Sequence, residues 1–126
     1  MYIGITTDGK ISICGTPQKH IRGNVYLDPY DLIIIQIPDG PMQYYPKDHS
    51  DPYYIGRISD VGNSEYYYRT DSDYPEYMRG KIAIIGSTHF IYYESSYDES
   101  YERGKLMKVG DVRITYSPNG CIKTIG

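Results

Sequence analysis

The residues of this chain that could carry metal or nucleotide chemistry lie in two short acidic motifs. Residues 48–51 (Asp-His-Ser-Asp) combine two carboxylates with an imidazole, side chains that bind Zn²⁺ or Mn²⁺. Residues 71–73 (Asp-Ser-Asp) offer paired aspartates of the kind that can hold a metal–nucleotide complex. Asp and Ser are also common turn residues, because their side chains hydrogen-bond to nearby backbone groups. We therefore interpret both motifs as turns and predict no metal site, no cofactor and no catalytic residue.

A third motif has the spacing of a phosphate-binding loop. Residues 4–10 read Gly-x-x-x-x-Gly-Lys, but Ile11 stands where that loop needs a hydroxyl for Mg²⁺, and no helix pattern follows. The pair Asp8-Gly9 between alternating apolar residues instead predicts a β-hairpin. Cys14 is a candidate nucleophile with no supporting motif. The sequence thus leaves enzymatic activity open and favours a protein without one.

The segment 63–102 has the composition of a recognition surface. It contains nine of the 17 tyrosines, with eight carboxylates against three basic residues. Tyrosine offers a large contact area at low entropic cost, and spaced carboxylates can pair with Arg and Lys of a partner. The residues that we predict to form a partner-binding face are Tyr66, Tyr67, Tyr68, Asp71, Asp73, Glu76, Tyr77, Glu94, Asp98 and Glu102.

Such a face predicts a protein partner with a basic surface. Because an acidic surface repels phosphates, a long nucleic acid is disfavoured as a ligand. The leading hypothesis is a non-enzymatic binding or inhibitory protein that blocks a nucleic-acid-handling factor. Small, acidic, tyrosine-rich chains of this kind occur among accessory proteins of viruses and mobile elements that act on a host factor.

Three other interpretations stay open. The tyrosines and acids can be no more than strand formers on a solvated sheet face. A pocket could bind or cleave a small nucleotide, through stacking and phosphate contacts from Tyr97, Tyr101, Arg103, Lys105, Lys108 and Arg113. Exposed strand edges could make the chain a structural assembly subunit. The sequence does not indicate an oligomeric state.

Length and composition bound these hypotheses. A chain of 126 residues forms one domain with a core of its own. The net charge of −3 is uneven, because the segment from residue 103 onward is basic while 63–102 is acidic. The longest apolar runs, 32–35 and 82–85, are too short to cross a membrane, and no leader pattern opens the sequence. With only Cys14 and Cys121, we expect a reduced, cytoplasmic protein.

Local patterns predict a mostly β protein. Residues 32–37 (Leu-Ile-Ile-Ile-Gln-Ile) are apolar on both faces, as in a central strand covered on both sides. Residues 81–93 predict one long strand with a bend at Gly86. A Ser-x-x-Glu capping box at 96–99, followed by Gly104, predicts one short helix over 97–103. The final residues, around the turn 117–120, predict a hairpin.

We therefore expect an antiparallel sandwich or a partly open barrel of about seven to eight short strands, with the helix near 97–103. A weak internal similarity accompanies this pattern: residues 2–8 resemble 54–60, and residues 9–16 resemble 80–87. If this similarity is a duplication, the acidic, tyrosine-rich segment 61–79 is an insertion between the two strands of the second copy within a single domain, 1–126.

Overall fold

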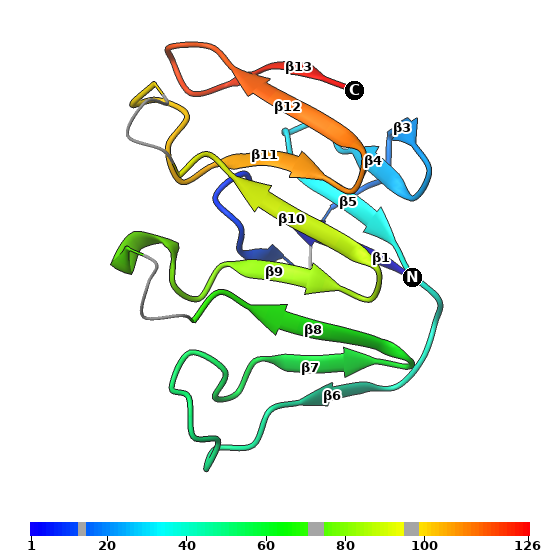
Figure 1. The fold of residues 1–126 in the computed structure, drawn as a ribbon. Coiled ribbons are helices and arrows are strands. Elements are labelled where there is room, and N and C mark those ends of the chain that lie inside the picture. The colour runs from blue at the N-terminus through cyan, green and yellow to red at the C-terminus, as the bar shows by residue number, and fades with distance from the viewer. Residues whose placement is uncertain (13–14, 71–74, 95–98) are drawn as a thin grey trace.

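The computed structural model is a two-layered, antiparallel β protein and not a closed barrel. It describes residues 1–12, 15–70, 75–94 and 99–126. One layer is a five-stranded sheet in the order β2-β1-β5-β4-β3, and the other is an eight-stranded sheet that runs from β6 to β13 in sequence order. Figure 1 shows the larger sheet in front, with β6 at its lower edge and β13 at its upper edge. The predicted sandwich is confirmed.

The strands are short and more numerous than the sequence predicted. Those of the five-stranded sheet are β1 (Tyr2–Ile5), β2 (Ile11–Ser12), β3 (Lys19–Arg22), β4 (Val25–Leu27) and β5 (Ile33–Gln36). Those of the eight-stranded sheet are β6 (Met42–Tyr44), β7 (Ile58–Val61), β8 (Ser64–Tyr68), β9 (Ile82–Ile85), β10 (Thr88–Tyr92), β11 (Leu106–Val109), β12 (Val112–Tyr116) and β13 (Ile122–Ile125). In the part of the chain that the structure describes, the one helix is the 3₁₀ turn η1 (Glu76–Met78).

One hydrophobic core lies between the two sheets. Strand β5 is central in its sheet, and Ile33, Ile34 and Ile35 are all buried, as the apolar run predicted. The facing side chains of the larger sheet include Tyr66, Phe90 and Ile114, which are equally buried. The predicted hairpin over Asp8-Gly9 is also present, because β1 pairs with β2 and Gly9 adopts a φ of 86°. No helix among the described residues is long and apolar enough to cross a membrane.

Two predicted elements are wrong. Residues 81–93 do not form one bent strand: Gly86 adopts a φ of 60° and starts a tight turn, so the segment folds into the hairpin β9–β10. A glycine in this conformation reverses the chain because its backbone twist suits a two-residue hairpin turn. The predicted helix over 97–103 is not found in its described part, where residues 100–104 form turns. The amides of Glu102 and Arg103 both bond to the Glu99 carbonyl, so the coil closes once and does not propagate.

The eight-stranded sheet is built from a tandem repeat with a period of 24 residues. One tyrosine of each hairpin donates its hydroxyl proton to the carbonyl oxygen of the first strand of that hairpin. These bonds are Tyr68 to Ile58 (2.9 Å), Tyr92 to Ile82 (2.6 Å) and Tyr116 to Leu106 (2.8 Å). Because both donors and acceptors recur at the same spacing, the hairpins are copies of one structural unit.

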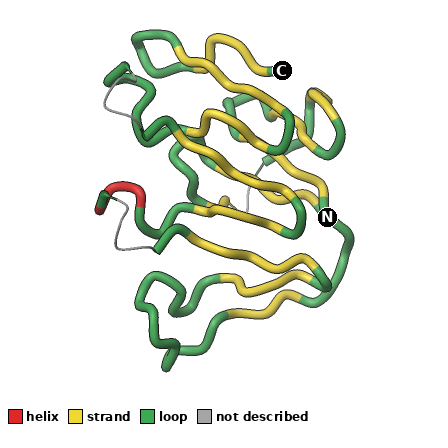
Figure 2. Tube along the Cα trace, in the orientation of Figure 1, coloured by secondary structure: helices red, strands yellow, loops and turns green. Residues whose placement is uncertain are grey.

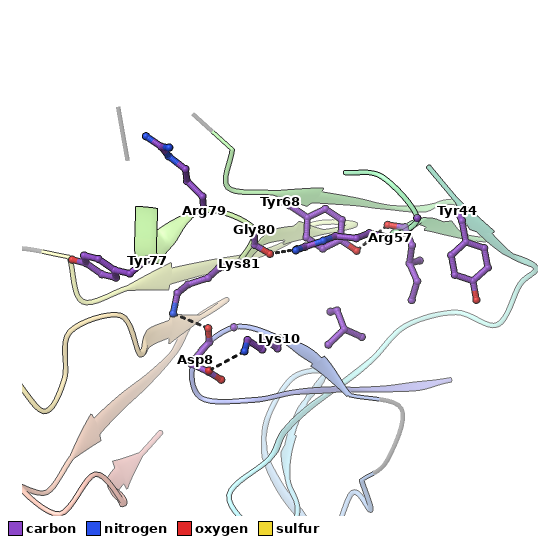
Figure 3. A pocket seen from close by; sticks show the side chains of 13 residues that line it. Asp8, Lys10, Tyr44, Arg57, Tyr68, Tyr77, Arg79, Gly80 and Lys81 are labelled. Carbon is purple, nitrogen blue, oxygen red and sulfur yellow. Dashed lines mark hydrogen bonds and ion pairs between the residues drawn. The ribbon is translucent and has the colours of Figure 1, made fainter. Parts of the chain in front are cut away.

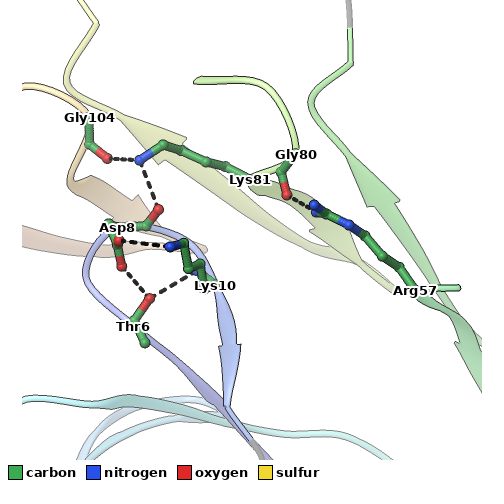
Figure 4. A network of polar contacts seen from close by, with 7 residues as sticks. All are labelled: Thr6, Asp8, Lys10, Arg57, Gly80, Lys81 and Gly104. Atoms are coloured by element: carbon green, nitrogen blue, oxygen red, sulfur yellow. Dashed lines mark hydrogen bonds and ion pairs between the residues drawn. The ribbon is translucent and has the colours of Figure 1, made fainter. Parts of the chain in front are cut away.

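A basic residue joins each unit to the next. It lies directly before the first strand, donates to a glycine carbonyl of the following loop and covers the tyrosine ring of its own hairpin. The three sets are Arg57, Gly80 and Tyr68; Lys81, Gly104 and Tyr92; and Lys105, Gly120 and Tyr116. Figure 4 shows the first two of these cation–carbonyl contacts. Figure 2 shows the loops gathered at one end of the sheet and the tight turns at the other.

The period is visible in the sequence once the units are aligned. Units 58–81 and 82–105 share Ile at position 1, Gly at position 5, Tyr at position 11 and Gly-Lys at positions 23 and 24. Unit 106–121 keeps Gly at position 5 and Tyr at position 11, has Leu at position 1, and has a shorter loop that ends in Gly-Cys; Ile122 opens another unit. The similarity of residues 2–8 to 54–60 has no structural counterpart, because Tyr2–Ile5 is a strand and residues 52–56 form turns. Segment 61–79 contains the end of β7, β8 and η1, which belong to the array.

A buried hydroxyl without a partner provides the first testable prediction. The Tyr66 hydroxyl is buried and has no hydrogen-bond partner among the described residues, and the next unit has Phe90 at this position. Tyr66→Phe is expected to leave the free energy of unfolding unchanged or to raise it by about 1 kcal/mol, because an unsatisfied buried polar group is removed. Urea denaturation followed by circular dichroism measures this change. A loss comparable to that of Tyr68→Phe, which breaks a bond to Ile58, would contradict it.

Candidate functional site

The structure separates the residues that were predicted to form one acidic tyrosine face. Tyr66 and Tyr68 are buried in the core, which excludes them from a binding face, whereas Tyr67 is 42 % exposed. This alternation follows from strand geometry, because successive side chains of β8 point to opposite sides of the sheet. Tyr67 lies opposite Ile84 of β9 on the outer face.

The other predicted residues that the structure describes belong to the loops at one end of the larger sheet. Glu76 and Tyr77 lie in η1 and are exposed, and Glu102 is half-buried in the next loop. Asp71, Asp73 and Asp98 lie outside the described residues. Glu94 accepts a hydrogen bond from the Arg69 guanidinium at 2.6 Å, so part of its charge is balanced within the chain. Continuous acidity is therefore not a property of the described part of this surface.

A cavity lies where the two sheets meet at this loop end. Its volume is about 520 Å³. The β1–β2 turn forms one wall, and the starts of β7 and β9 form the other. Figure 3 shows Tyr44 and Tyr77 at opposite ends of the cavity, with Lys81 directed toward Asp8 and the Arg79 guanidinium directed away from it. Both end tyrosines are exposed, Tyr44 by 59 % and Tyr77 by 51 %.

Three cations and one carboxylate converge on this cavity. The Lys81 amine donates to the carbonyl oxygens of Asp8 at 2.8 Å and Gly104 at 2.6 Å. Arg57 donates to the Gly80 carbonyl. The Lys10 amine lies 4.0 Å from the Asp8 carboxylate, and its side chain is largely solvent-exposed. The Thr6 hydroxyl orients this turn by donating to Asp8 and accepting from the Lys10 amide, as Figure 4 shows.

Titration of the cavity groups reflects this arrangement. Burial lowers the pKa of Lys81 below its usual value, although the neighbouring Asp8 charge opposes that effect. Burial by itself would raise the pKa of Asp8, but the Thr6 hydrogen bond, the local backbone and the charges of Lys81 and Lys10 together lower it. A lowered carboxyl pKa keeps Asp8 ionised at neutral pH. Its single negative charge does not balance the charges of Lys10, Arg57 and Lys81, so the cavity carries a net positive charge that suits an anion.

The histidine motif forms a folded turn. The Asp51 amide donates to His49 Nδ1 at 3.0 Å, and the His49 ring stacks on Tyr54 with 5.0 Å between centroids. Within the described residues, no three His, Cys, Asp or Glu side chains are placed to hold a metal ion. His89 is exposed on the outer face, opposite Ile84.

The basic residues predicted to hold a small nucleotide do not surround one site. Lys105 donates to the Gly120 carbonyl at 3.0 Å and covers Tyr116. Lys108 and Arg113 face each other across β11 and β12, away from that loop end. Tyr101 packs against the core, and Tyr97 lies outside the described residues. A different set of basic side chains, Lys10, Arg57 and Lys81, lines one cavity in the described structure.

The sequence patterns did not predict that the cavity residues lie together. Lys10 comes from the first hairpin, whereas Arg57 and Lys81 come from loops far along the chain. The recurring pattern Gly-Arg-Ile at 56–58 and Gly-Lys-Ile at 80–82 was the available signal. Comparison with known proteins adds no assignment: no protein-family model, no curated protein and no solved structure matches this chain.

Proposed function

We propose that this protein is a binding protein whose cavity takes a small anionic ligand with a planar ring, such as a nucleotide. The observation that carries the proposal is the convergence of Lys10, Arg57 and Lys81 beside the exposed Tyr44 ring in one cavity. Its volume falls within the range of about 300–1,000 Å³ that is typical of small-molecule sites.

The three cations differ in what they can offer a ligand. Arg57 and Lys81 already donate to backbone carbonyls, so they fix the walls and add a positive field. Among the residues that the structure describes, Lys10 is held only by a long contact to Asp8, so its exposed side chain can turn toward a phosphate. An ammonium–phosphate hydrogen bond is charge-assisted and stronger than a neutral one. An aromatic base could stack on Tyr44, since stacking on tyrosine tolerates many bases.

The test compares ligands that share a nucleoside and differ in the number of phosphate groups. Adenosine, AMP and ATP are titrated into the protein by calorimetry, and we expect AMP or ATP to bind and adenosine to bind much more weakly. Lys10→Gln is expected to weaken phosphate-ligand binding by about ten- to a hundredfold, the value of one charge-assisted hydrogen bond. Because Lys10 is exposed, this substitution should not change the thermal midpoint of the free protein.

Lys19→Gln is the matched control, because it removes an exposed lysine on β3 of the opposite sheet edge. It should bind like the unaltered protein. Equal affinity in Lys10→Gln, or the absence of binding by every phosphate ligand, would rule out the proposal.

A protein partner is the second candidate function. It is favoured by the outer face of the larger sheet, where Tyr67 of β8 and Ile91 of β10 are exposed. Glu65 lies on the same strand as Tyr67, opposite Asp60 of β7. Exposed aromatic and aliphatic side chains next to carboxylates would suit a basic, nucleic-acid-handling protein, and inhibition of such a factor by a viral or mobile-element accessory protein is the specific form of this hypothesis. Capture of such a partner at low salt, lost in Glu65→Lys, would support it.

A further inference from the structure

The two edges of the eight-stranded sheet are unlike its interior strands. Positions 9 and 11 of each complete unit are buried, namely Tyr66 and Tyr68, Phe90 and Tyr92, and Ile114 and Tyr116. Segment 34–57 keeps the same period, with Tyr44 at position 11 and Gly-Arg at positions 23 and 24. Its position-9 and position-11 side chains on β6, Met42 and Tyr44, are 41 % and 59 % exposed. Strand β6 therefore presents core-type side chains without a neighbour on one side.

The cause is a change of sheet within that unit. Its first strand, β5, pairs with β1 and β4 in the five-stranded sheet. Strand β6 pairs with β7, and no other described strand lies along its second edge. β6 is thus the second strand of a repeat hairpin whose first-strand position is vacant in the larger sheet.

The opposite edge has the complementary feature. Residues 122–126 read Ile-x-x-Ile-Gly, as do residues 82–86, so β13 is the first strand of a unit. It pairs with β12, and its other edge carries no strand among the residues described. The Gly126 amide bonds to the Arg113 carbonyl at 2.9 Å, as the Gly110 amide bonds to the His89 carbonyl one unit earlier.

The backbone groups on both edges are available for pairing. The Gly62 amide donates to the Pro41 carbonyl, so Pro41 faces β7, and the next residue, Met42, directs its own amide and carbonyl toward the open edge. Pro41 has no amide hydrogen, but an incoming strand on the open edge would not need one, because this position faces β7. By the same alternation, the backbone amide and carbonyl of Ile125 point toward the open edge of β13, because those of Gly126 bond to β12.

Side-chain composition distinguishes β6 from the other edges. Natural edge strands are protected by short length or by charged residues. β2 has two residues, β3 carries Lys19, His20 and Arg22, and β13 carries Lys123. β6 (Met-Gln-Tyr) has no charge. The segments around the two ends of the larger sheet also differ in sign, because residues 39–60 hold four aspartates against Lys47 and Arg57, and residues 103–126 are basic.

We propose that β13 of one copy pairs with β6 of a second copy and completes a repeat hairpin between them. In the register of β7 and β8, Thr124 would lie opposite Pro41 of the second copy, and Ile125 opposite Gly40. The larger sheets of both copies then continue as one array. Because each copy uses different edges, the contact is head-to-tail and leaves one β6 and one β13 free for further copies.

The repeat also predicts a side-chain contact across this junction. Tyr44 of the second copy would occupy the position of Tyr68, and Cys121 of the first copy would occupy the position of Arg57. Cys121 is exposed and free, and cannot supply the cation that covers the tyrosine in the other units. Cys121→Lys restores that residue type, so it is expected to tighten the association about two- to fivefold.

Sedimentation equilibrium over a range of protein concentrations tests the junction. We expect the mass to rise above the 14.5 kDa of one chain as concentration increases, without a limiting dimer. Met42→Pro removes the outward amide of β6 and should reduce association at least tenfold. When this variant is mixed with the unaltered protein, its intact β13 should still bind a free β6 and so shorten the assemblies. Met42 does not line the cavity, so the Met42→Pro variant should still bind nucleotide. Loss of association with nucleotide binding intact therefore separates this proposal from the proposed function.

Tyr30→Lys is the matched control, since Tyr30 is 89 % exposed and belongs to neither edge of the larger sheet. It should associate like the unaltered protein. A second readout is the rate of Cys121 alkylation by peptide mass spectrometry, which should fall as association proceeds. A single mass of 14.5 kDa at all concentrations, or association that Met42→Pro leaves unchanged, would overturn the proposal.

Discussion

The protein is expected to unfold in mild alkali, beginning near pH 10 and completing near pH 11. Four buried tyrosines cause this: Tyr66, Tyr68, Tyr92 and Tyr116. Burial raises the pKa of Tyr66 to about 12 and raises the pKa values of the other three further above the ordinary value of 10.0. In the unfolded chain the same phenols ionise near their ordinary pKa of about 10.

The sign of the effect follows from proton binding. Above pH 10 the unfolded chain holds fewer protons than the folded chain, so the free energy of unfolding falls as the pH rises. The stabilising contribution is complete below pH 10 and is lost as the pH rises toward the folded-state pKa values. Each tyrosine lowers the free energy of unfolding by about 1.4 kcal/mol at pH 11, so four of them lower it by about 6 kcal/mol, a large part of the stability of a typical domain.

Circular dichroism and phenolate absorbance measured between pH 8 and 12 test this expectation. The absorbance of the four buried phenolates should appear together with loss of the β signal. Tyr66→Phe should shift the unfolding transition to higher pH because it removes one of the four groups. Folded structure that persists with all tyrosines ionised would contradict the buried positions.

Replacement of Tyr92 by alanine is expected to lower the free energy of unfolding by about 3–5 kcal/mol, as for other large buried aromatic residues. Tyr92 is 2 % exposed and donates to the Ile82 carbonyl at 2.6 Å. The Arg69 guanidinium carbon and the Lys81 amine lie 5.1 Å and 5.5 Å from its ring centre. Tyr92→Phe should cost about 1–3 kcal/mol, because it keeps the ring and leaves the Ile82 carbonyl unsatisfied.

Tyr92 also holds the first hairpin against the larger sheet. A side chain at Gly9 would overlap its ring, so the β1–β2 turn packs directly on it. The Gly9 carbonyl accepts a bond from Ile82, and the Thr7 carbonyl accepts one from Leu106. Urea denaturation measures the two substitutions against Ile91→Ala, whose side chain lies on the outer face of the same strand and should cost less than about 1 kcal/mol. Equal losses for Tyr92→Ala and Ile91→Ala would contradict this assignment.

The repeat explains why the proposed site and the fold share residues. Arg57 and Lys81 join consecutive units and also line the cavity. Substituting either would change stability and ligand binding together. Lys10 comes from outside the array, which makes it the informative position for a binding test.

Local patterns were sufficient for the strand content and for some turns. The apolar run 32–37 predicted a central strand because only a strand covered on both sides buries consecutive isoleucines. Asp8-Gly9 predicted a hairpin because its backbone favours a reversal. The helix over 97–103 failed because a capping box and a C-terminal glycine do not offset the cost of nucleating so short a helix.

The sequence alone determined a mostly β, tyrosine-rich chain with opposite charges in its middle and its end, because these properties depend only on composition and local pattern. It also contained the 24-residue period, although the variable loops concealed it until recurring hydrogen bonds aligned the units. Only the tertiary structure decided which tyrosines are buried and which cations converge. Strand alternation turns Tyr66 and Tyr68 inward and Tyr67 outward, and packing of the first hairpin on the array brings Lys10 to Arg57 and Lys81.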